Sequence, residues 1–157
     1  FELIIPNDLV AKLWDELIQN GATPCGLGAR DTLRIEAGLP LYGHELSEEI
    51  TPLMTRYSSW VIDFSKNFIG KEALLKSKDN KDKLKTVGFV MQDRVIPRAD
   101  YKIIEGGKVT SGTLSPYLDK PIGLALVDSN FSDIDSEINI QIRGKNYAAK
   151  VVKLPFI

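Results

Sequence analysis

The stretch from Pro24 to Gly43 reads Pro-Cys-Gly-Leu-Gly-Ala-Arg-Asp-Thr-Leu-Arg-Ile-Glu-Ala-Gly-Leu-Pro-Leu-Tyr-Gly. Good helix formers follow Gly26 and Gly28, and Gly38 with Pro40 closes the run, so the stretch predicts a short helix opened by a glycine turn. Two arginines and two acids lie among its apolar positions, which is unusual for a helix that only covers a core. These charged positions are therefore the first candidates for a function.

Arg30 and Arg34 are four residues apart and share one face of the predicted helix, whereas Asp31 and Glu36 are rotated away from it. Such a face is a candidate site for an anion or a polar ligand. Asp31 precedes Arg34 by three residues, and an ion pair within the helix is the interpretation that we favour for these two. For Arg30, the residues alone favour a structural salt bridge to Asp31 or Glu36.

The residues before this helix predict one strand and one longer helix. Residues 1–5, Phe-Glu-Leu-Ile-Ile, predict a strand in which Glu2 is simply the outward residue at a sheet edge. Asn7 can cap the helix that follows, and Asn20 with Gly21 can end it. Apolar residues recur along this helix at helical spacing, at Leu9, Val10, Leu13, Trp14, Leu17 and Ile18.

The remaining sequence predicts a change from helices to strands. Residues 39–57 predict an irregular stretch, a further helix begins after Gly70, and the almost wholly charged run 76–85 predicts a solvated helix end and a linker. Six short runs rich in β-branched residues then predict strands, with tight turns at 105–108 and 143–146. Because no helix separates them, they predict a small barrel or sandwich, and the whole chain is α+β. The six runs are 87–91, 101–104, 108–113, 123–127, 138–142 and 147–153.

Composition argues against several classes of function. The formal net charge of -1 gives no reason to expect a nucleic acid or an anionic membrane as partner, and no apolar run approaches the roughly 18 residues of a spanning helix. Cys25 is the only cysteine in the sequence, which excludes an internal disulfide; we interpret it as a small packed residue beside a glycine turn. Residues 26–31 lack the third glycine of a dinucleotide fingerprint, and no Walker lysine or metal-binding triad is present.

Two further groups of residues invite catalytic interpretations that we do not favour. His44 is the only histidine, yet no nucleophile or second titratable group is placed to work with it as a general base. Residues 110–115, Thr-Ser-Gly-Thr-Leu-Ser, offer candidate nucleophilic hydroxyls, but they fit a strand and turn better.

Residues 26–45 resemble the signature of the glycine cleavage system T protein, the tetrahydrofolate-dependent aminomethyltransferase. Ordered matches along a chain are more specific than any single motif. The further matches to this family are Thr51-Pro52, Trp60, residues 68–74, 109–116 and 122–125, and Pro155-Phe156.

The resemblance implies a division into two domains. Residues 1–81 would be the C-terminal part of a folate-binding α+β domain and residues 82–157 a small antiparallel β-barrel domain, with the boundary near Asp82. In this family the strand at Phe1 continues a longer polypeptide, whose first half holds the aspartate most closely tied to catalysis. We therefore expect this chain to be a fragment that carries no catalytic residue of its own and is inactive alone.

The resemblance also implies three ligand contacts. The glutamate of the Phe-Glu strand and the arginine of the Ala-Arg-Asp motif correspond to Glu2 and Arg30. One carboxylate can accept the two parallel donors of a pterin, and a guanidinium suits the polar tail of the ligand or can hold that carboxylate. Trp60 matches a tryptophan near the folate, although residues 52–60 are one residue longer than the family pattern and lack its glycines. Core packing is the alternative role for Trp60.

The implied function is transfer of a methylene unit from the aminomethyl-dihydrolipoyl arm of the H protein to tetrahydrofolate, with release of ammonia. Tetrahydrofolate is then the co-substrate, the lipoylated H protein is the partner, and the expected location is the bacterial cytoplasm, or the mitochondrion in a eukaryote.

Two alternatives remain open for the function. One is a folate-dependent relative with another substrate, such as the folate domain of sarcosine or dimethylglycine dehydrogenase or a sulfoniopropionate demethylase. The other is a barrel kept only for docking a partner. The iron–sulfur assembly relative is disfavoured, because its cysteine-containing motif is absent where residues 68–71 stand.

Overall fold

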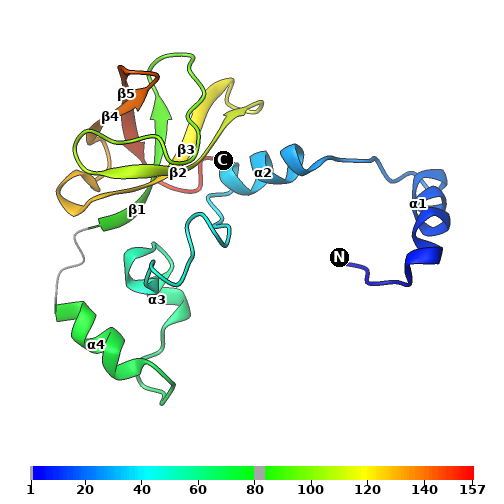
Figure 1. Ribbon diagram of the computed structural model, residues 1–157, viewed down its shortest axis with the longest axis horizontal. Helices are drawn as coiled ribbons and strands as arrows, with labels where there is room; N and C mark the ends of the chain where they lie inside the picture. The colour runs from blue at the N-terminus through cyan, green and yellow to red at the C-terminus, as the bar shows by residue number, and fades with distance from the viewer. Residues whose placement is uncertain (1, 80–83) are drawn as a thin grey trace. The chain divides into compact units, whose positions relative to one another are not determined.

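A computed structural model describes residues 2–79 and 84–157 and divides the chain into two compact units, Phe1–Arg30 and Asp31–Ile157 (Figure 1). The boundary between the units falls inside helix α2 (Leu27–Glu36). The domain boundary expected near Asp82 lies outside the described residues, so the division into 1–81 and 82–157 stays a prediction.

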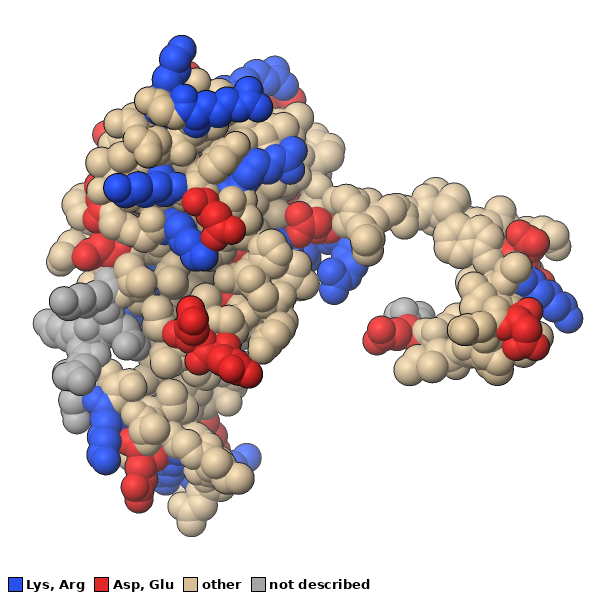
Figure 2. All heavy atoms as spheres, viewed as in Figure 1, with Lys and Arg blue, Asp and Glu red and all other residues tan. Residues whose placement is uncertain are grey.

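The first unit contains helix but no strand among its described residues. A 3₁₀ turn, η1 (Asn7–Leu9), leads into α1 (Val10–Gln19), which is amphipathic and has no buried residue. Uncharged side chains cover much of this unit in Figure 2. The strand expected at residues 1–5 is absent from residues 2–5, which lack regular structure. An edge strand needs a neighbouring strand for its hydrogen bonds, and no described segment pairs with this one.

The sequence predicts the C-terminal end of α1 correctly but not the cap at its N-terminal end. Asn7 does not cap the helix, because it is itself the first residue of η1 and no side chain caps that turn. At the other end Asn20 and Gly21 close the helix as expected. Gly21 has φ of +94°, and the amide of Ala22 donates to the carbonyl of Leu17 at 3.0 Å.

The helical part of the second unit is short and irregular. After α2 the chain turns at Gly38, whose φ is +66°, and this confirms the predicted helix end. The remaining helical elements are η2 (Pro52–Met54), α3 (Ser58–Val61) and α4 (Lys71–Asp79), so the expected helix after Gly70 is also confirmed.

The barrel consists of one antiparallel sheet with strand order β2-β3-β1-β5-β4. Val87 pairs with Ala125 between β1 and β3, and Phe89 pairs with Val151 between β1 and β5. The last hairpin turns at Arg143-Gly144, both with positive φ, as expected for a two-residue connection. The strands are β1 (Leu84–Met91), β2 (Gly107–Ser115), β3 (Lys120–Asp128), β4 (Glu137–Ile142) and β5 (Lys145–Val152), with η3 (Ser129–Phe131) after β3.

The sixth expected strand, residues 101–104, is reduced to two isolated bridges. Lys102 pairs with Lys108, and Ile103 pairs with Ile140. The amide of Ile104 also donates to the carbonyl of Asn139 at 2.9 Å. The segment thus bonds both to residues of β2 and to residues of β4, the two edges of the sheet, and so closes it into a barrel.

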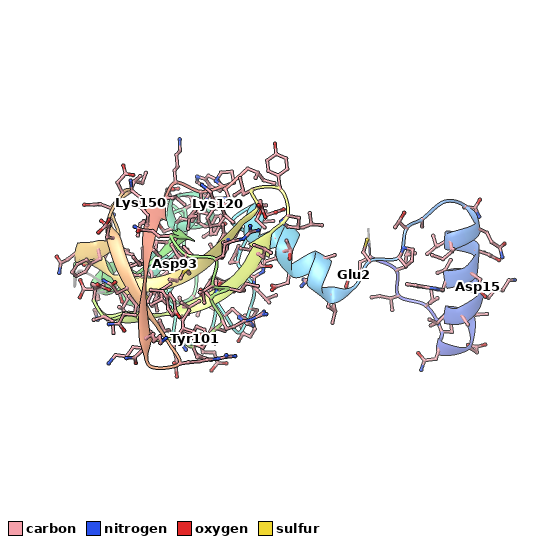
Figure 3. All side chains as sticks on the ribbon, turned by 90° about the horizontal axis from the view of Figure 1, so that it is seen from above. Glu2, Asp15, Asp93, Tyr101, Lys120 and Lys150 are labelled. Carbon is pink, nitrogen blue, oxygen red and sulfur yellow. The ribbon has the colours of Figure 1, made fainter. Side chains whose placement is uncertain are left out.

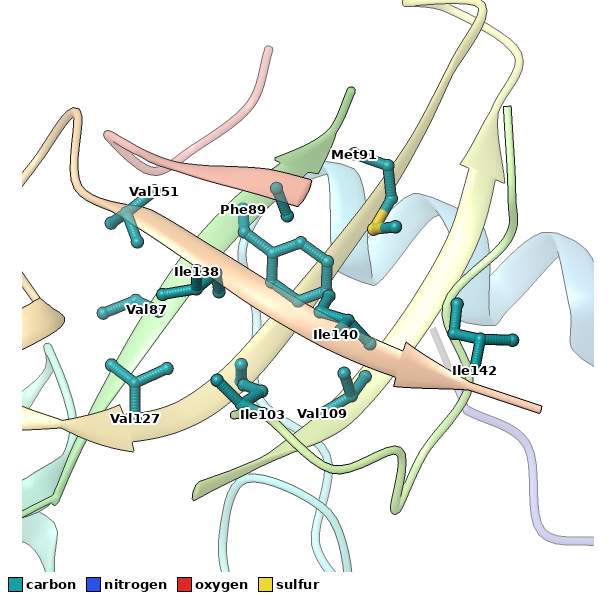
Figure 4. Close-up of a cluster of buried hydrophobic side chains, with 12 residues drawn as sticks. Val87, Phe89, Met91, Ile103, Val109, Val127, Ile138, Ile140, Ile142 and Val151 are labelled. Carbon is teal, nitrogen blue, oxygen red and sulfur yellow. The ribbon is translucent and has the colours of Figure 1, made fainter. Parts of the chain in front are cut away.

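Figure 4 shows the apolar core that this closure encloses. Phe89 lies at its centre and is fully buried, and β-branched residues from every strand surround it. Burial of aliphatic and aromatic surface is the main favourable term for folding of such a barrel. The α+β class predicted from the sequence is confirmed. Among the described residues, no helix is both long and apolar enough to cross a bilayer.

We predict that Gly123→Ala destabilises the barrel by about 2 kcal/mol or more. A Cβ at Gly123 would lie 2.5 Å from the ring of Phe89 and 2.6 Å from the carbonyl oxygen of Ser111, and neither group can move away freely. Urea unfolding measures the change. Gly28→Ala in α2 is the control, because nothing lies within 4 Å of its Cβ position and alanine favours a helix. A Gly123→Ala variant as stable as the parent would contradict the packing described here.

Candidate functional site

Residues 26–45, which we call the signature stretch, are attached to the barrel through alternate residues of β2. A bulge between Val109 and Ser111 shifts the register of this strand against β3. Beyond it, every second residue presents a hydroxyl to the signature stretch. Ser111 bonds to Arg34 and Glu45, Thr113 bonds to Thr32, and Ser115 donates to Glu36. The strand expected at 108–113 is confirmed, and the hydroxyls of Ser111 and Thr113 make structural contacts.

The most deeply buried of these contacts is an ion pair between Arg34 and Glu45. Nη1 of Arg34 lies 2.8 Å from Oε2 of Glu45, and the two side chains are only 9% and 1% exposed. Ser111 bridges the pair, since its hydroxyl accepts from Nη2 of Arg34 at 2.7 Å and donates to Oε1 of Glu45 at 2.6 Å. The amide of Leu41 donates to Oε2 at 3.0 Å. Both buried charges are therefore hydrogen-bonded as well as paired.

The two acids of the signature helix have different partners: Asp31 pairs with Arg34, and Glu36 bonds to a serine of β2. Nε of Arg34 donates to Asp31 at 2.8 Å, which confirms the expected pair within the helix. Glu36 is buried and accepts from Ser115. Both carboxylates that the sequence offered as structural partners for Arg30 are thus engaged by other groups.

The three residues expected to contact a ligand lie in different parts of the chain. Glu2, labelled in Figure 3, and Arg30 belong to the first unit, and both are exposed. Trp60 belongs to the second unit and is 74% exposed, which argues against core packing. No hydrogen bond or ion pair in the described part of the chain joins Glu2 to Arg30. Their roles as ligand contacts stay predictions.

Trp60 is held by an aromatic and a cationic neighbour. Its ring meets that of Tyr57 edge to face at a centroid distance of 5.7 Å, and the guanidinium of Arg56 lies 5.9 Å from its centroid. The hydroxyl of Tyr57 donates to the carbonyl of Gly38 at the end of α2. Burial raises the pKa of Tyr57 above its ordinary value, while the nearby charge of Arg56 acts in the opposite direction.

Neither His44 nor Cys25 has a described hydrogen bond to another titratable or nucleophilic side chain. Nδ1 of His44 lies 2.8 Å from the carbonyl oxygen of Thr110, and because a carbonyl only accepts, Nδ1 carries the proton. Cys25 is exposed, so the expectation of a packed residue is wrong. The whole glycine-rich segment from residue 21 to residue 30 is exposed, so Cys25 is not part of a packed turn. No cluster of metal-ligating side chains occurs in the ranges 2–79 and 84–157.

Two hollows lie on the barrel, and neither includes a predicted ligand contact. One, of about 600 Å³, has both acids and lysines in its lining, including Asp93, Lys120 and Lys150, which Figure 3 labels. The other, of about 560 Å³, is basic. Its charged lining consists of Arg94, Arg98, Arg143 and Lys145.

Two exposed ion pairs on the barrel shift the pKa values of Asp100 and Lys150, and neither pair includes a predicted ligand contact. A hydrogen bond from Lys108 lowers the pKa of Asp100, and a hydrogen bond to Asp135 raises the pKa of Lys150. Both pairs are solvent-exposed, so they contribute little to stability.

Comparison with known proteins agrees with this architecture of a helical segment joined to a small antiparallel barrel. The model of the GCVT N-terminal domain matches residues 1–66, and the model of the glycine cleavage T-protein C-terminal barrel domain matches residues 85–157. The chain belongs to the glycine cleavage T-protein family.

Relatives of the chain carry the name aminomethyltransferase. The protein of Thermoanaerobacter pseudethanolicus is 48% identical and that of Bacillus mycoides 47%, each over 99% of this chain and 45% of the relative. The crystal structure of glycine cleavage system aminomethyltransferase T from Bartonella henselae matches with a TM-score of 0.87 at 30% identity, over 98% of this chain and 45% of that one. The chain thus spans about half the length of these relatives.

Reasoning from sequence missed Glu45 and Ser111 as the partners of Arg34. A signal was present, because Ser111, Thr113 and Ser115 alternate at the period of a strand, as hydroxyls do on a polar face. The bulge between Val109 and Ser111, which turns this face toward the signature stretch, cannot be recognised from the amino-acid composition.

We predict that Arg34→Met costs about 3–5 kcal/mol of stability, because it leaves Glu45 charged and buried without a cation. Chemical denaturation measures the loss. Arg98→Met, at an exposed arginine, should stay within about 0.5 kcal/mol of the parent. Adding Glu45→Gln to Arg34→Met should recover part of the loss. If the single variant costs under 1 kcal/mol, roughly the net value of one hydrogen bond, the ion pair does not anchor the stretch.

We also predict a dependence of stability on pH through Tyr57. Its pKa is higher in the folded chain, so its contribution is complete below the ordinary tyrosine value of about 10 and is lost as pH rises above it. The difference in unfolding free energy between the parent and Tyr57→Phe should be about 1 kcal/mol at neutral pH, for the lost hydrogen bond, and should shrink above pH about 10. A difference that grows with pH would contradict this assignment.

Proposed function

We propose that the protein to which this chain belongs is an aminomethyltransferase of the glycine cleavage system, and that it transfers a methylene unit to tetrahydrofolate with release of ammonia. The observation that carries this proposal is the signature stretch 26–45 on α2, in a chain 48% identical over 99% of its length to a protein named aminomethyltransferase. We propose further that the lipoylated H protein delivers the methylene unit.

The proposed ligand contacts are Glu2, Arg30 and Trp60. The carboxylate of Glu2 is exposed and can accept two parallel donors of a pterin, an arrangement that both orients and binds the ring. The exposed face of Trp60 can stack on a flat ring, and the fork of Arg30 can hold either the ligand or the Glu2 carboxylate. None of the three has a described ion pair that the ligand must displace.

The buried contacts of Arg34 with Glu45 and Ser111 support this proposal, because they distinguish a structural arginine from an exposed one in the signature stretch. Arg34 is bonded to Glu45 and Ser111 and fixes the C-terminal half of α2 to β2. Arg30 stands one turn earlier on the same helix with its side chain exposed.

Three finer statements also belong to the proposal. We assign residues 1–81 to the folate-binding domain and residues 82–157 to the barrel domain. We expect the reacting aspartate to come from a part of the protein that this chain does not include, and we expect the whole protein to work in the cytoplasm.

A chimera tests the function most directly. This chain replaces the matched 45% of the Thermoanaerobacter pseudethanolicus relative, and aminomethyl transfer from lipoylated H protein to tetrahydrofolate is measured. We predict activity comparable to that of the intact relative, and a Kd for tetrahydrofolate raised about tenfold or more by Glu2→Gln and by Arg30→Gln, since each removes a charge-assisted hydrogen bond.

Matched variants make the outcome specific. Glu16→Gln on α1 and Arg98→Gln on the barrel remove exposed charges of the same kind and should leave the Kd unchanged. If Glu2→Gln and Arg30→Gln also leave it unchanged in an active chimera, the ligand contacts are wrong. A folded chimera that binds folate but transfers only from a different methyl donor points to the relative with another substrate. A folded chimera without folate binding or transfer favours the docking function.

A further inference from the structure

Arg56 is a half-buried cation that forms no ion pair with the residues that the structure describes. Its Nη1 is buried without a hydrogen-bond partner in the same described ranges. Desolvating a charged donor without giving it an acceptor is costly. The rest of the Arg56 side chain lines a wider pocket, so an anion bound there would lie beside a cation that has no described ion pair.

Two aromatic rings hold this guanidinium in a defined position. Its central carbon lies 5.1 Å from the ring centroid of Tyr57 and 5.9 Å from that of Trp60. Nη1 of Arg56 also lies 3.1 Å from the position that a Cβ on Gly38 would occupy. The backbone just after α2 therefore limits the movement of the guanidinium. A fork that is already positioned loses less entropy when it binds a ligand.

A pocket of about 270 Å³ adjoins Arg56, and its lining offers donors but no carboxylate. Lys153 contributes a second cation, and Thr86 on β1 contributes a hydroxyl, whereas the hydroxyl of Ser132 already donates to the carbonyl of Ser129 at 2.8 Å. The hydroxyl oxygen of Thr86 is itself buried without a partner. The volume is slightly below the range of drug-sized sites and suits a small ligand.

Glu45, a buried acid, does not pair with Arg56. Glu45 lines a small enclosed space that Arg56 and Thr86 also line. Its two oxygens, however, already accept from Arg34, Ser111 and the amide of Leu41, and it forms no ion pair with Arg56 within 4.0 Å.

We propose that this pocket binds a small oxyanion, a carboxylate or a phosphate, with Arg56 as its principal ligand. A guanidinium presents two parallel donors that match the oxygens of either group. Lys153 adds charge, and the hydroxyl of Thr86 adds hydrogen-bonding capacity. The site does not depend on the proposed transfer reaction, and it lies where residues 52–60 depart from the family pattern.

Arg56→Gln removes the positive charge of Arg56 without breaking a described hydrogen bond. Arg56 donates no described side-chain hydrogen bond, so its replacement leaves no protein acceptor unpaired, and glutamine keeps most of its length. Arg98→Gln is the matched control, because it removes the same charge from an exposed position that lines the other, basic hollow. Thermal unfolding of both variants checks that they remain folded.

The experiment is a titration of the 157-residue chain at constant ionic strength, followed by amide chemical shifts in two-dimensional NMR. Sodium phosphate and sodium acetate are the two probes, and tens of millimolar is the upper limit. We expect saturable shifts at Thr86, Gly88, Ser132 and Lys153, and an affinity at least about tenfold weaker in Arg56→Gln than in Arg98→Gln, as expected for loss of a charge-assisted contact.

The two probes distinguish the source of the oxyanion. Tighter binding of phosphate assigns the site to a phosphate group, and tighter binding of acetate assigns it to a carboxylate. Either result supports the proposal if Arg56→Gln weakens that binding at least about tenfold relative to Arg98→Gln. Shifts that Arg98→Gln weakens equally would show only general attraction to positive charge and would overturn the proposal. The absence of saturable shifts at these amides for both probes would also overturn it.

Discussion

The ion pair between Arg34 and Glu45 is the interaction on which the arrangement of the second unit depends. Two charges this deeply buried are tolerated only when each is paired and fully hydrogen-bonded, and Ser111 and the amide of Leu41 complete the set. One partner lies on α2, one in the irregular stretch after it, and one on β2. Satisfying the two charges therefore brings three separate segments together at one point.

This constraint explains why the compact unit begins at Asp31, in the middle of a helix. From Thr32 to Glu45 the side chains of the signature stretch bond to alternate residues of β2, whereas α1 has no buried residue at all. The second half of the signature thus folds with the barrel. The first half, with Arg30, presents its side chains to solvent.

The sequence predicted most elements because their signals are local. Gly38 and Pro40 mark the end of α2, Arg143-Gly144 marks a hairpin, and β-branched runs mark five strands. The errors occur where a residue depends on distant partners. Residues 2–5 have strand character but no neighbouring strand, residues 101–104 bond to both edges of the barrel only through isolated bridges, and Cys25 is exposed. The candidate ligand contacts were identified by resemblance, while the partners of Arg34, which are 11 and 77 residues away, came only from the structure.

The claim that the signature stretch is anchored on β2 is tested most directly by native-state hydrogen exchange. The amides of Ala37, Gly38 and Leu39 donate to carbonyls of α2, and β3 lies between β2 and β1 in the sheet. If the junction makes these segments one cooperative unit, both sets should exchange with opening free energies that agree within about 1 kcal/mol. Exchange of residues 37–39 at an opening free energy several kcal/mol lower, while β3 stays protected, would contradict the account.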